Sequence, residues 1–221
     1  MEHAGYGAFC EAASAALEQE AHLLGTTPLD RLISLESRWH PNGFAVFHLD
    51  DYHKLGKLRL HIWPDSGRVV RPDDAPIHTH VWHLYSRILT GLYSETIYEL
   101  SDPEVAGSKE YNSAAINYLV DKDSFTAPSR AFLRMVKTTH ATNGGVHAVA
   151  ADVPHETHVG EGSFVATLLV TSDPRSAQAT MYSSEVIHSS SYERPLLTKA
   201  QKMNLLGRLE QELRGQTGCG K

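Results

Sequence analysis

The sequence has few cysteines, no long apolar run and no cluster of basic residues. Cys10 and Cys219 are the two cysteines among 221 residues, which excludes a disulfide framework and leaves one bridge between the two ends as the most that the chain could form. No stretch approaches the roughly 20 apolar residues of a membrane span, and no basic segment followed by an apolar run marks a signal peptide. The formal net charge of -6 argues against a general affinity for nucleic acid or for anionic membranes. These absences predict a soluble protein of the reducing cytoplasm.

The residue that the sequence has in unusual number is histidine, with 14 copies. Number alone identifies nothing, but the segment 77–89 places His78 and His80 two positions apart and continues as an apolar and aromatic run, which indicates a strand. Residues two apart on a strand point to the same side, so both imidazoles would reach into one volume. Two histidines on one strand can supply two ligands of a divalent metal ion.

A third ligand has to come from another part of the chain. The sequence Val153-Pro154-His155 offers His155, and His147 and His158 are the competitors nearby. Three neutral imidazoles can bind Fe(II), Zn(II), Ni(II) or Cu(II). The alternative interpretation is that these are ordinary strand and loop histidines that bind no metal. We expect a metal site that His155 completes.

The rest of the chain has the pattern of many short strands between two helical ends. Apolar residues recur at helical spacing in 8–24, 29–35 and 198–214. Alternating or short apolar segments predict strands at 44–49, 57–63, 77–89, 93–100, 114–120, 131–138, 146–150, 164–171 and 180–186. Many short strands with regular turns indicate a mainly β sandwich or barrel rather than alternating α/β units.

The same pattern predicts how the domain is organised. No internal repeat and no linker divides the sequence. We therefore expect a single domain over 1–221, with N-terminal helices in 8–38, a β-barrel over 44–188 and a C-terminal helix over 198–214. An exposed sheet edge could support a homodimer.

The histidine motifs resemble those of the cupin superfamily. The first cupin motif joins a His-x-His pair to a glycine eleven residues after the second histidine, and His80 and Gly91 keep that spacing. The usual glutamate falls at Leu84, so this carboxylate ligand is missing, and Asp152 replaces the customary glycine before the Val-Pro-His of the second motif. The resemblance implies a mainly β, cupin-type barrel, a double-stranded β-helix or jelly roll, with N- and C-terminal helices. The metal ligands that it implies are His78, His80 and His155.

A closer resemblance is to cysteine dioxygenase and related thiol dioxygenases, which also use three histidines and lack the glutamate. Their first motif has a His-x-His pair, a nearby third histidine and a glycine followed by a Glu-Thr segment. This sequence has His83 after the pair, and Glu95-Thr96 after the glycine, and the strand with Trp63 also resembles the family. The resemblance covers roughly residues 44 to 171 and implies an Fe(II) enzyme that uses O₂.

Substrate-binding candidates follow from the predicted strands. In a continuous strand, Trp82 and Leu84 share the face of the two histidines, whereas His83 would point inward only with a bulge. Alternation in 57–63 puts Leu58, Leu60 and Ile62 on one face and Arg59, His61 and Trp63 on the other, and an arginine can bind an acidic substrate. An aromatic strand residue can also approach substrate. The candidates are Trp82, His83, Leu84, His61, Arg59 and Tyr98.

The leading hypothesis is a cupin oxygenase that oxidises a small polar molecule with O₂ at a three-histidine Fe(II) site. Fe(II) is the metal we expect, and Zn(II), Ni(II) and Cu(II) are the alternatives. Without a carboxylate the ion keeps its full charge, which favours an anionic group on the substrate. One competing hypothesis is a non-oxidative metal-dependent lyase or isomerase, which oxygen uptake would discriminate. Another is a cupin that binds a small molecule without catalysis, which would keep its ligand after all three histidines are replaced.

Overall fold

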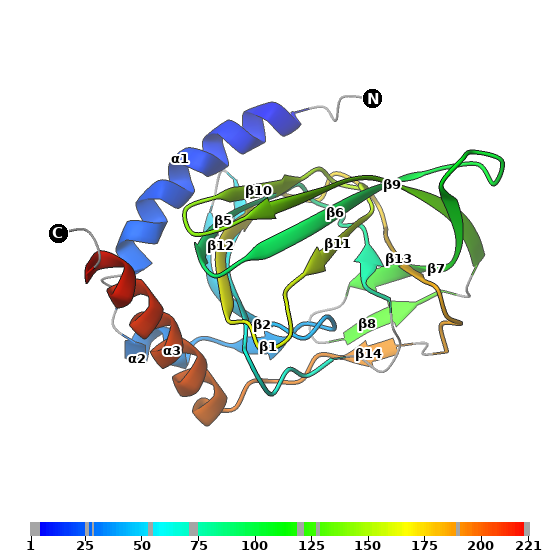
Figure 1. Ribbon diagram of the computed structural model, residues 1–221. Coiled ribbons are helices and arrows are strands. Elements are labelled where there is room, and N and C mark those ends of the chain that lie inside the picture. The colour runs from blue at the N-terminus through cyan, green and yellow to red at the C-terminus, as the bar shows by residue number, and fades with distance from the viewer. Residues whose placement is uncertain are drawn as a thin grey trace.

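Two β-sheets make up most of the structure, and helices lie against one of them (Figure 1). The structure is a computed structural model that describes residues 5–24, 27, 29–52, 55–70, 75–118, 122–126, 129–188 and 191–218. The bridge between Cys10 and Cys219 considered above involves a residue outside these ranges.

The helices and strands alternate little along the chain, as expected for a mainly β protein. The helices are α1 (Tyr6–Leu24), α2 (Leu29–Ser34) and α3 (Lys199–Gly218). The strands are β1 (Ser37–Trp39), β2 (Ala45–Tyr52), β3 (Gly56–Trp63), β4 (Ile77–His78), β5 (Leu84–Thr90), β6 (Tyr93–Leu100), β7 (Ser108–Tyr118), β8 (Lys122–Phe125), β9 (Ser129–Ala141), β10 (Val146–Val149), β11 (His155–His158), β12 (Val165–Thr171), β13 (Ala179–Ser183) and β14 (Ser191–Glu193).

The strand pairing is that of a jelly roll. One sheet, here called the β3 sheet, runs β1-β2-β3-β12-β5-β10, and the other, the β6 sheet, runs β13-β4-β11-β6-β9-β7-β8-β14. The antiparallel pairs β3–β12, β4–β11, β5–β10 and β6–β9 are nested, because each earlier strand joins a progressively nearer later one. Such nesting arises when one long hairpin rolls up into two facing sheets, which together form the barrel.

A further pairing closes part of the β6 sheet into a ring of strands. Strand β13 pairs with β4 on one side and with β7 on the other. As a result β13, β4, β11, β6, β9 and β7 form a closed ring. The mainly β jelly-roll barrel with helices at both ends, expected from the sequence, is confirmed.

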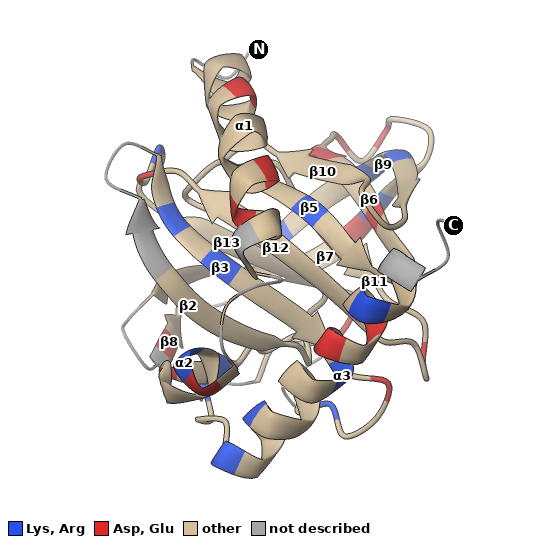
Figure 2. Cartoon of the chain, turned by 90° about the vertical axis from the view of Figure 1, so that its left-hand side faces the viewer, with Lys and Arg blue, Asp and Glu red and all other residues tan. Residues whose placement is uncertain are grey.

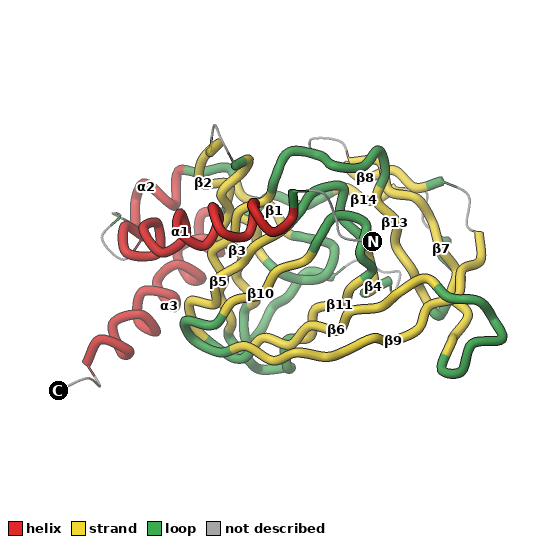
Figure 3. Tube along the Cα trace, turned by 90° about the horizontal axis from the view of Figure 1, so that it is seen from above, coloured by secondary structure: helices red, strands yellow, loops and turns green. Residues whose placement is uncertain are grey.

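The helices cover the outer face of the β3 sheet (Figures 2 and 3). Their apolar residues, such as Leu17 and Leu206, join sheet residues such as Phe47, Leu60 and Leu168 in one buried cluster. The predicted alternation in β3 is observed, since Leu60 faces the helices while His61 lines a cavity inside the barrel. Strand β12 is buried along its whole length, because it is central in the sheet and both of its faces are covered.

The turn between β5 and β6 explains the glycine of the first motif. Gly91 has a φ of 88°, in the left-handed region that favours glycine. A Cβ at this position would lie 2.4 Å from the carbonyl oxygen of Phe164 and 2.7 Å from Cγ2 of Val165. Only a residue without a side chain therefore lets this turn lie against the start of β12.

The prediction of one strand over 77–89 is wrong. The segment contains two strands, β4 and β5, and residues 79–83 between them are irregular. The backbone of this interruption bonds to other loops, because the carbonyl of His80 accepts the N–H of Asp152 and that of Val81 accepts the N–H of Arg175. The alternation argument that put His78 and His80 on one strand face does not apply.

Other predicted elements differ mainly at their ends. The short strands β1, β8, β11 and β14 were not expected, and β1 lies within and just beyond the region 8–38 predicted to be helical. Helix α3 continues to Gly218, beyond the predicted end at 214. None of the helices in the described part of the chain is long and apolar enough to cross a membrane.

Candidate metal centre

His78 and His155 are brought together by strand pairing. They are direct partners in the β4–β11 ladder, so their side chains leave the sheet on the same side. Their ring centroids are 4.6 Å apart, and both residues are buried. Alternation along β11 explains why His155 faces inward together with Thr157, whereas Glu156 and His158 face the other side.

His80 joins this pair from the irregular segment after β4. Its ring centroid lies 4.9 Å from that of His78 and 4.7 Å from that of His155. The potential ligand atoms of the three residues all lie within 4.8 Å of one another. The structure thus brings the three predicted ligands into one compact cluster, and a backbone hydrogen bond of 2.9 Å from Asp152 to the carbonyl of His80 ties their two chain segments together.

The ring nitrogens of this cluster fit a divalent metal ion. Nδ1 of His78 donates to the carbonyl of Pro76 at 3.0 Å, and Nδ1 of His155 donates to the carbonyl of Val153 at 2.9 Å. Each bond fixes the tautomer in which Nε2 carries the lone pair that a metal needs. Nδ1 of His80 is buried and has no hydrogen-bond partner among the described residues, as expected for a nitrogen that binds a metal ion.

Burial keeps the imidazoles of His80 and His155 in the neutral form that binds metals. The pKa of His155 is well below its usual value, first because of burial and then because of the neighbouring His78. The pKa of His80 is lowered in the same way, by burial and by both other histidines. A neutral ring has no extra proton to lose when it binds an ion, so the metal does not have to compete with protons for these nitrogens at physiological pH.

Asp152 stands directly before Val153-Pro154-His155, at the motif position where a glycine is customary, and its backbone adopts a conformation that is typical of glycine. Its φ is 64°, and it is the one non-glycine residue with a positive φ in the part of the chain that the structure describes. Aspartate tolerates the left-handed region better than most residues. The turn therefore keeps the shape that directs His155 into the barrel and lets the Asp152 N–H bond His80.

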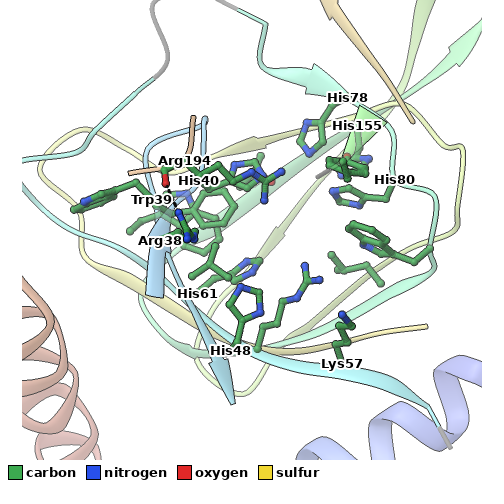
Figure 4. Close-up of a pocket in the computed structure, with 18 of the residues that line it drawn as sticks. Arg38, Trp39, His40, His48, Lys57, His61, His78, His80, His155 and Arg194 are labelled. Atoms are coloured by element: carbon green, nitrogen blue, oxygen red, sulfur yellow. Dashed lines mark hydrogen bonds between the residues drawn. The ribbon is translucent and has the colours of Figure 1, made fainter. Parts of the chain in front are cut away.

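The three histidines form part of the wall of a cavity of about 480 Å³ inside the barrel. In Figure 4 they lie together on one side, with His48, His61 and Lys57 opposite. This volume suits a small ligand, since small-molecule sites measure about 300–1,000 Å³. The charged side chains of the wall are Glu36, Arg38, Lys57, Arg59 and Arg194.

The wall carries an excess of positive charge. Arg194 makes a bidentate ion pair with Asp123, and Arg38 pairs with Glu36 at 3.0 Å. Lys57 and Arg59 add two more cations on β3. A ligand with an anionic group is therefore favoured inside the barrel.

Four of the six predicted substrate-binding residues line this cavity. Trp82 stacks on His80 with ring centroids 5.6 Å apart, and the guanidinium of Arg59 lies 5.2 Å from the centre of the Trp82 ring. His61 and Leu84 also line it. Burial, followed by the charge of Arg59, holds the pKa of His61 well below its usual value, and Nε2 of His61 has no hydrogen-bond partner in the described structure.

The other two predicted residues lie elsewhere. His83 is buried under α1, where its ring contacts those of Tyr6 and Phe9 at centroid distances of 5.2 and 5.8 Å. The irregular segment before β5 turns it to the helix side, opposite to the cavity. Tyr98 lies beyond a register shift in the β6–β9 ladder, and its hydroxyl donates to Glu156 at 2.9 Å on the outer side of β11. Neither residue lines the cavity.

The competitors for the third ligand are placed apart from the cluster. His158 has half of its side chain exposed and lies 3.4 Å from a carboxylate oxygen of Glu156. His147 lines the cavity from β10, but its Nε2 faces Glu95, 3.7 Å from Oε2. Burial lowers the pKa of His147 to about 4.

Glu95 is a buried carboxyl group beside the cluster. Its Oε2 accepts hydrogen bonds from the hydroxyls of Tyr93 at 2.6 Å and Thr157 at 3.0 Å. Its Oε1 lies 3.9 Å from Nε2 of His155. Burial raises the pKa of Glu95 to about 8. The sequence singled out Glu95 only as part of a motif; a charged residue in an otherwise alternating strand was the signal for an inward-facing acid.

Several cavity residues could not be found from the sequence. Arg38 and Trp39 come from β1, and Arg194 follows β14, two short strands that no pattern marks. Tyr118 faces Trp82 from the end of β7, with ring centroids 5.2 Å apart. His48 also lines the cavity, and its ladder partner on β3 is Arg59.

No known family has a model that matches this chain, and no curated protein matches its sequence. Among solved structures, the chain is similar to oxalate decarboxylase from Bacillus subtilis at 14% sequence identity and a TM-score of 0.34, over 67% of this chain and 30% of that chain. A point variant of the same enzyme gives the same values. The chain therefore spans less than a third of the length of these structures, and a likeness at this level carries no argument about activity.

Proposed function

We propose that this protein is an Fe(II)-dependent oxygenase of the cupin type, resembling the thiol dioxygenases, that oxidises a small anionic molecule with O₂. The observation that carries the proposal is the convergence of three imidazoles, from His78, His80 and His155, on a cavity that also holds cationic side chains. The motif resemblance to cysteine dioxygenase around the His-x-His pair adds support for oxygen chemistry.

Three histidines would hold the ion through ring nitrogens whose orientation the chain has already fixed. The carbonyls of Pro76 and Val153 orient two of the rings, and stacking on Trp82 orients the third. When bound, Fe(II) supplies a redox-active Lewis acid with coordination positions that the three histidines leave open. The chain provides positioning and a mostly enclosed space.

The substrate class follows from the size and charge of the cavity. About 480 Å³ suits a molecule of amino-acid size or somewhat larger. Arg59 and Lys57 would bind a carboxylate or another anionic group, and Trp82 and Tyr118 offer flat apolar surfaces to the rest of the molecule. The buried Nε2 of His61 would take part in a hydrogen bond with a polar group of the substrate.

Metal content and oxygen consumption test this proposal together. Protein purified without oxygen should contain about one iron per chain, as expected for one three-histidine site. Replacement of any of the three histidines by alanine should remove the iron. The matched control is His140→Ala, which changes an exposed histidine of β9 that bonds Ser94.

An oxygen electrode then separates the candidate reactions. Small thiols and small carboxylic acids are supplied to the iron-loaded protein, and uptake that depends on the three histidines supports an oxygenase. Turnover of an acid without oxygen uptake would contradict the oxygenase and favour a lyase or isomerase. Metal retained in all three variants would contradict the ligand assignment itself.

A further inference from the structure

The two oxygens of the buried Glu95 side chain differ in their hydrogen bonding. Oε2 is held by the hydroxyls of Tyr93 and Thr157 at 2.6 and 3.0 Å. Oε1 is also buried, with no hydrogen-bond partner among the described residues. A buried carboxylate oxygen without a donor is costly, and either a proton on the group or a bound ion in its place offsets this cost.

The unexplained oxygen faces the metal cluster. It lies 3.9 Å from Nε2 of His155, and this nitrogen carries the lone pair because Nδ1 of the same ring bonds the carbonyl of Val153. Strand pairing places it there, since Glu95 and Thr157 are direct partners in the β6–β11 ladder, two positions from His155 on the same inward face. The ligand atoms of His78, His80 and His155 all lie within 4.8 Å of one another. Glu95 is not part of this group and lies next to it, on the side of His155.

We propose that Glu95 is a fourth ligand of the metal centre, which binds the ion through Oε1. This inference rests on the proposed metal site. The carboxylate comes from β6, whereas Leu84 on β5 occupies the motif position where a glutamate would otherwise stand. The chain thus supplies an oxygen ligand from a different strand.

A carboxylate ligand changes the charge and the metal preference of the site. Three neutral imidazoles leave a divalent ion with its full charge inside the barrel, and Glu95 reduces that charge by one while the ion still attracts an anionic substrate. A mixed nitrogen and oxygen ligand set suits ions that accept carboxylates, such as Mn(II) and Fe(II), more than three imidazoles alone do.

The test is metal binding by the full-length protein, freed of metal and titrated with Mn(II), Zn(II) or Co(II) in a calorimeter. Glu95→Gln keeps the shape of the side chain and an oxygen that can accept from Tyr93 and Thr157, but it removes the charge. We expect Mn(II) affinity to fall at least tenfold and Zn(II) affinity to fall less. The visible spectrum of bound Co(II) should also change, because the coordination changes.

Glu156→Gln is the matched control, because Glu156 is the neighbour of His155 on β11 but bonds Tyr98 on the outer side. It should bind all three ions as the wild type does. Circular dichroism checks that Glu95→Gln is folded, and Glu95→Asp, which keeps the charge, provides a second variant that should retain more Mn(II) affinity than Glu95→Gln.

Three results would count against the inference or its basis. Equal Mn(II) affinity in wild type and Glu95→Gln would overturn it and leave Glu95 as part of a structural network with Tyr93 and Thr157. Weaker affinity with an unchanged Co(II) spectrum would overturn direct ligation. A wild-type protein that binds none of the three ions would instead refute the metal site on which the proposed function depends.

Discussion

Replacement of His83 separates a structural role from a role in substrate binding. The side chain is 2% exposed and its Nδ1 accepts the buried N–H of Ala151 at 3.0 Å. Its own backbone N–H donates to Oγ of Ser172, which holds the segment before β5 in place. In His83→Ala the N–H of Ala151 loses its acceptor, at a cost of about 1–3 kcal/mol. Loss of the packed ring adds about 2–3 kcal/mol, so the total destabilisation should be about 4 kcal/mol.

His83→Asn isolates the hydrogen bond, because the amide oxygen of asparagine can take the position of Nδ1. This variant should lose the ring contacts with Tyr6 and Phe9 but retain the acceptor for Ala151, and it should be destabilised by roughly 2 kcal/mol. Urea unfolding followed by circular dichroism, in the presence of a chelator, measures both free energies. The slope of the transition should be unchanged if the variants unfold as the wild type does.

The same hydrogen bond connects His83 to the metal ligands. Ala151 precedes Asp152, whose N–H bonds the carbonyl of His80, and both lie in the turn that leads to His155. His83→Ala should therefore weaken metal binding several-fold, and His83→Asn should retain it. Destabilisation of His83→Ala by less than about 1 kcal/mol would refute this reasoning, since a buried hydrogen bond of this kind is worth at least that much.

Three further predictions concern the metal, the motif glycine and pH. Chelation of divalent ions present at about 100 times their Kd should lower the melting temperature of the wild type by roughly 5–10 °C and leave that of His80→Ala unchanged in scanning calorimetry. Gly91→Ala should destabilise the fold by at least about 2 kcal/mol in urea, because its Cβ would meet the carbonyl of Phe164; a wild-type midpoint would contradict the close approach. Burial raises the pKa of Glu95 to about 8 from 4.5, so the folded metal-free protein holds a proton that the unfolded chain releases. Its stability should therefore fall by about 1.4 kcal/mol per pH unit from this group as the pH rises between about 5 and 8. Glu95→Gln should remove that slope, and an equal slope in both proteins would count against it.

The sequence determined the class of fold through local patterns. Alternation in 57–63 correctly placed Leu60 against the helices and His61 inside the barrel, because strand geometry alone decides which residues share a face. Predicted strand 93–100 and observed strand β6 have the same bounds, and the helical spacing in 198–214 marks most of α3. The spacing from His80 to Gly91 correctly marked the turn between β5 and β6, where the backbone conformation and the close approach of Phe164 require a glycine.

The same patterns failed where the backbone bonds to distant segments. The strand expected over 77–89 is interrupted because the carbonyls of His80 and Val81 bond Asp152 and Arg175, which no local rule anticipates. His83 was a substrate-binding candidate that needed a bulge to point inward, and it lies under α1 instead. Tyr98 is one residue after Ile97, the ladder partner of His155, and therefore points to the opposite side of the sheet, which only the β6–β11 pairing shows.

By itself, then, the sequence determined which residues could share a face and which short motifs carry histidine ligands. Only the tertiary structure decided which faces meet: His155 lies opposite His78 because β4 and β11 pair, and Glu95 lies beside His155 because β6 pairs with β11. The period of a strand fixes the direction of a side chain but contains no information about the neighbouring strand. That choice depends on the free energy of the whole barrel, to which residues throughout the chain contribute.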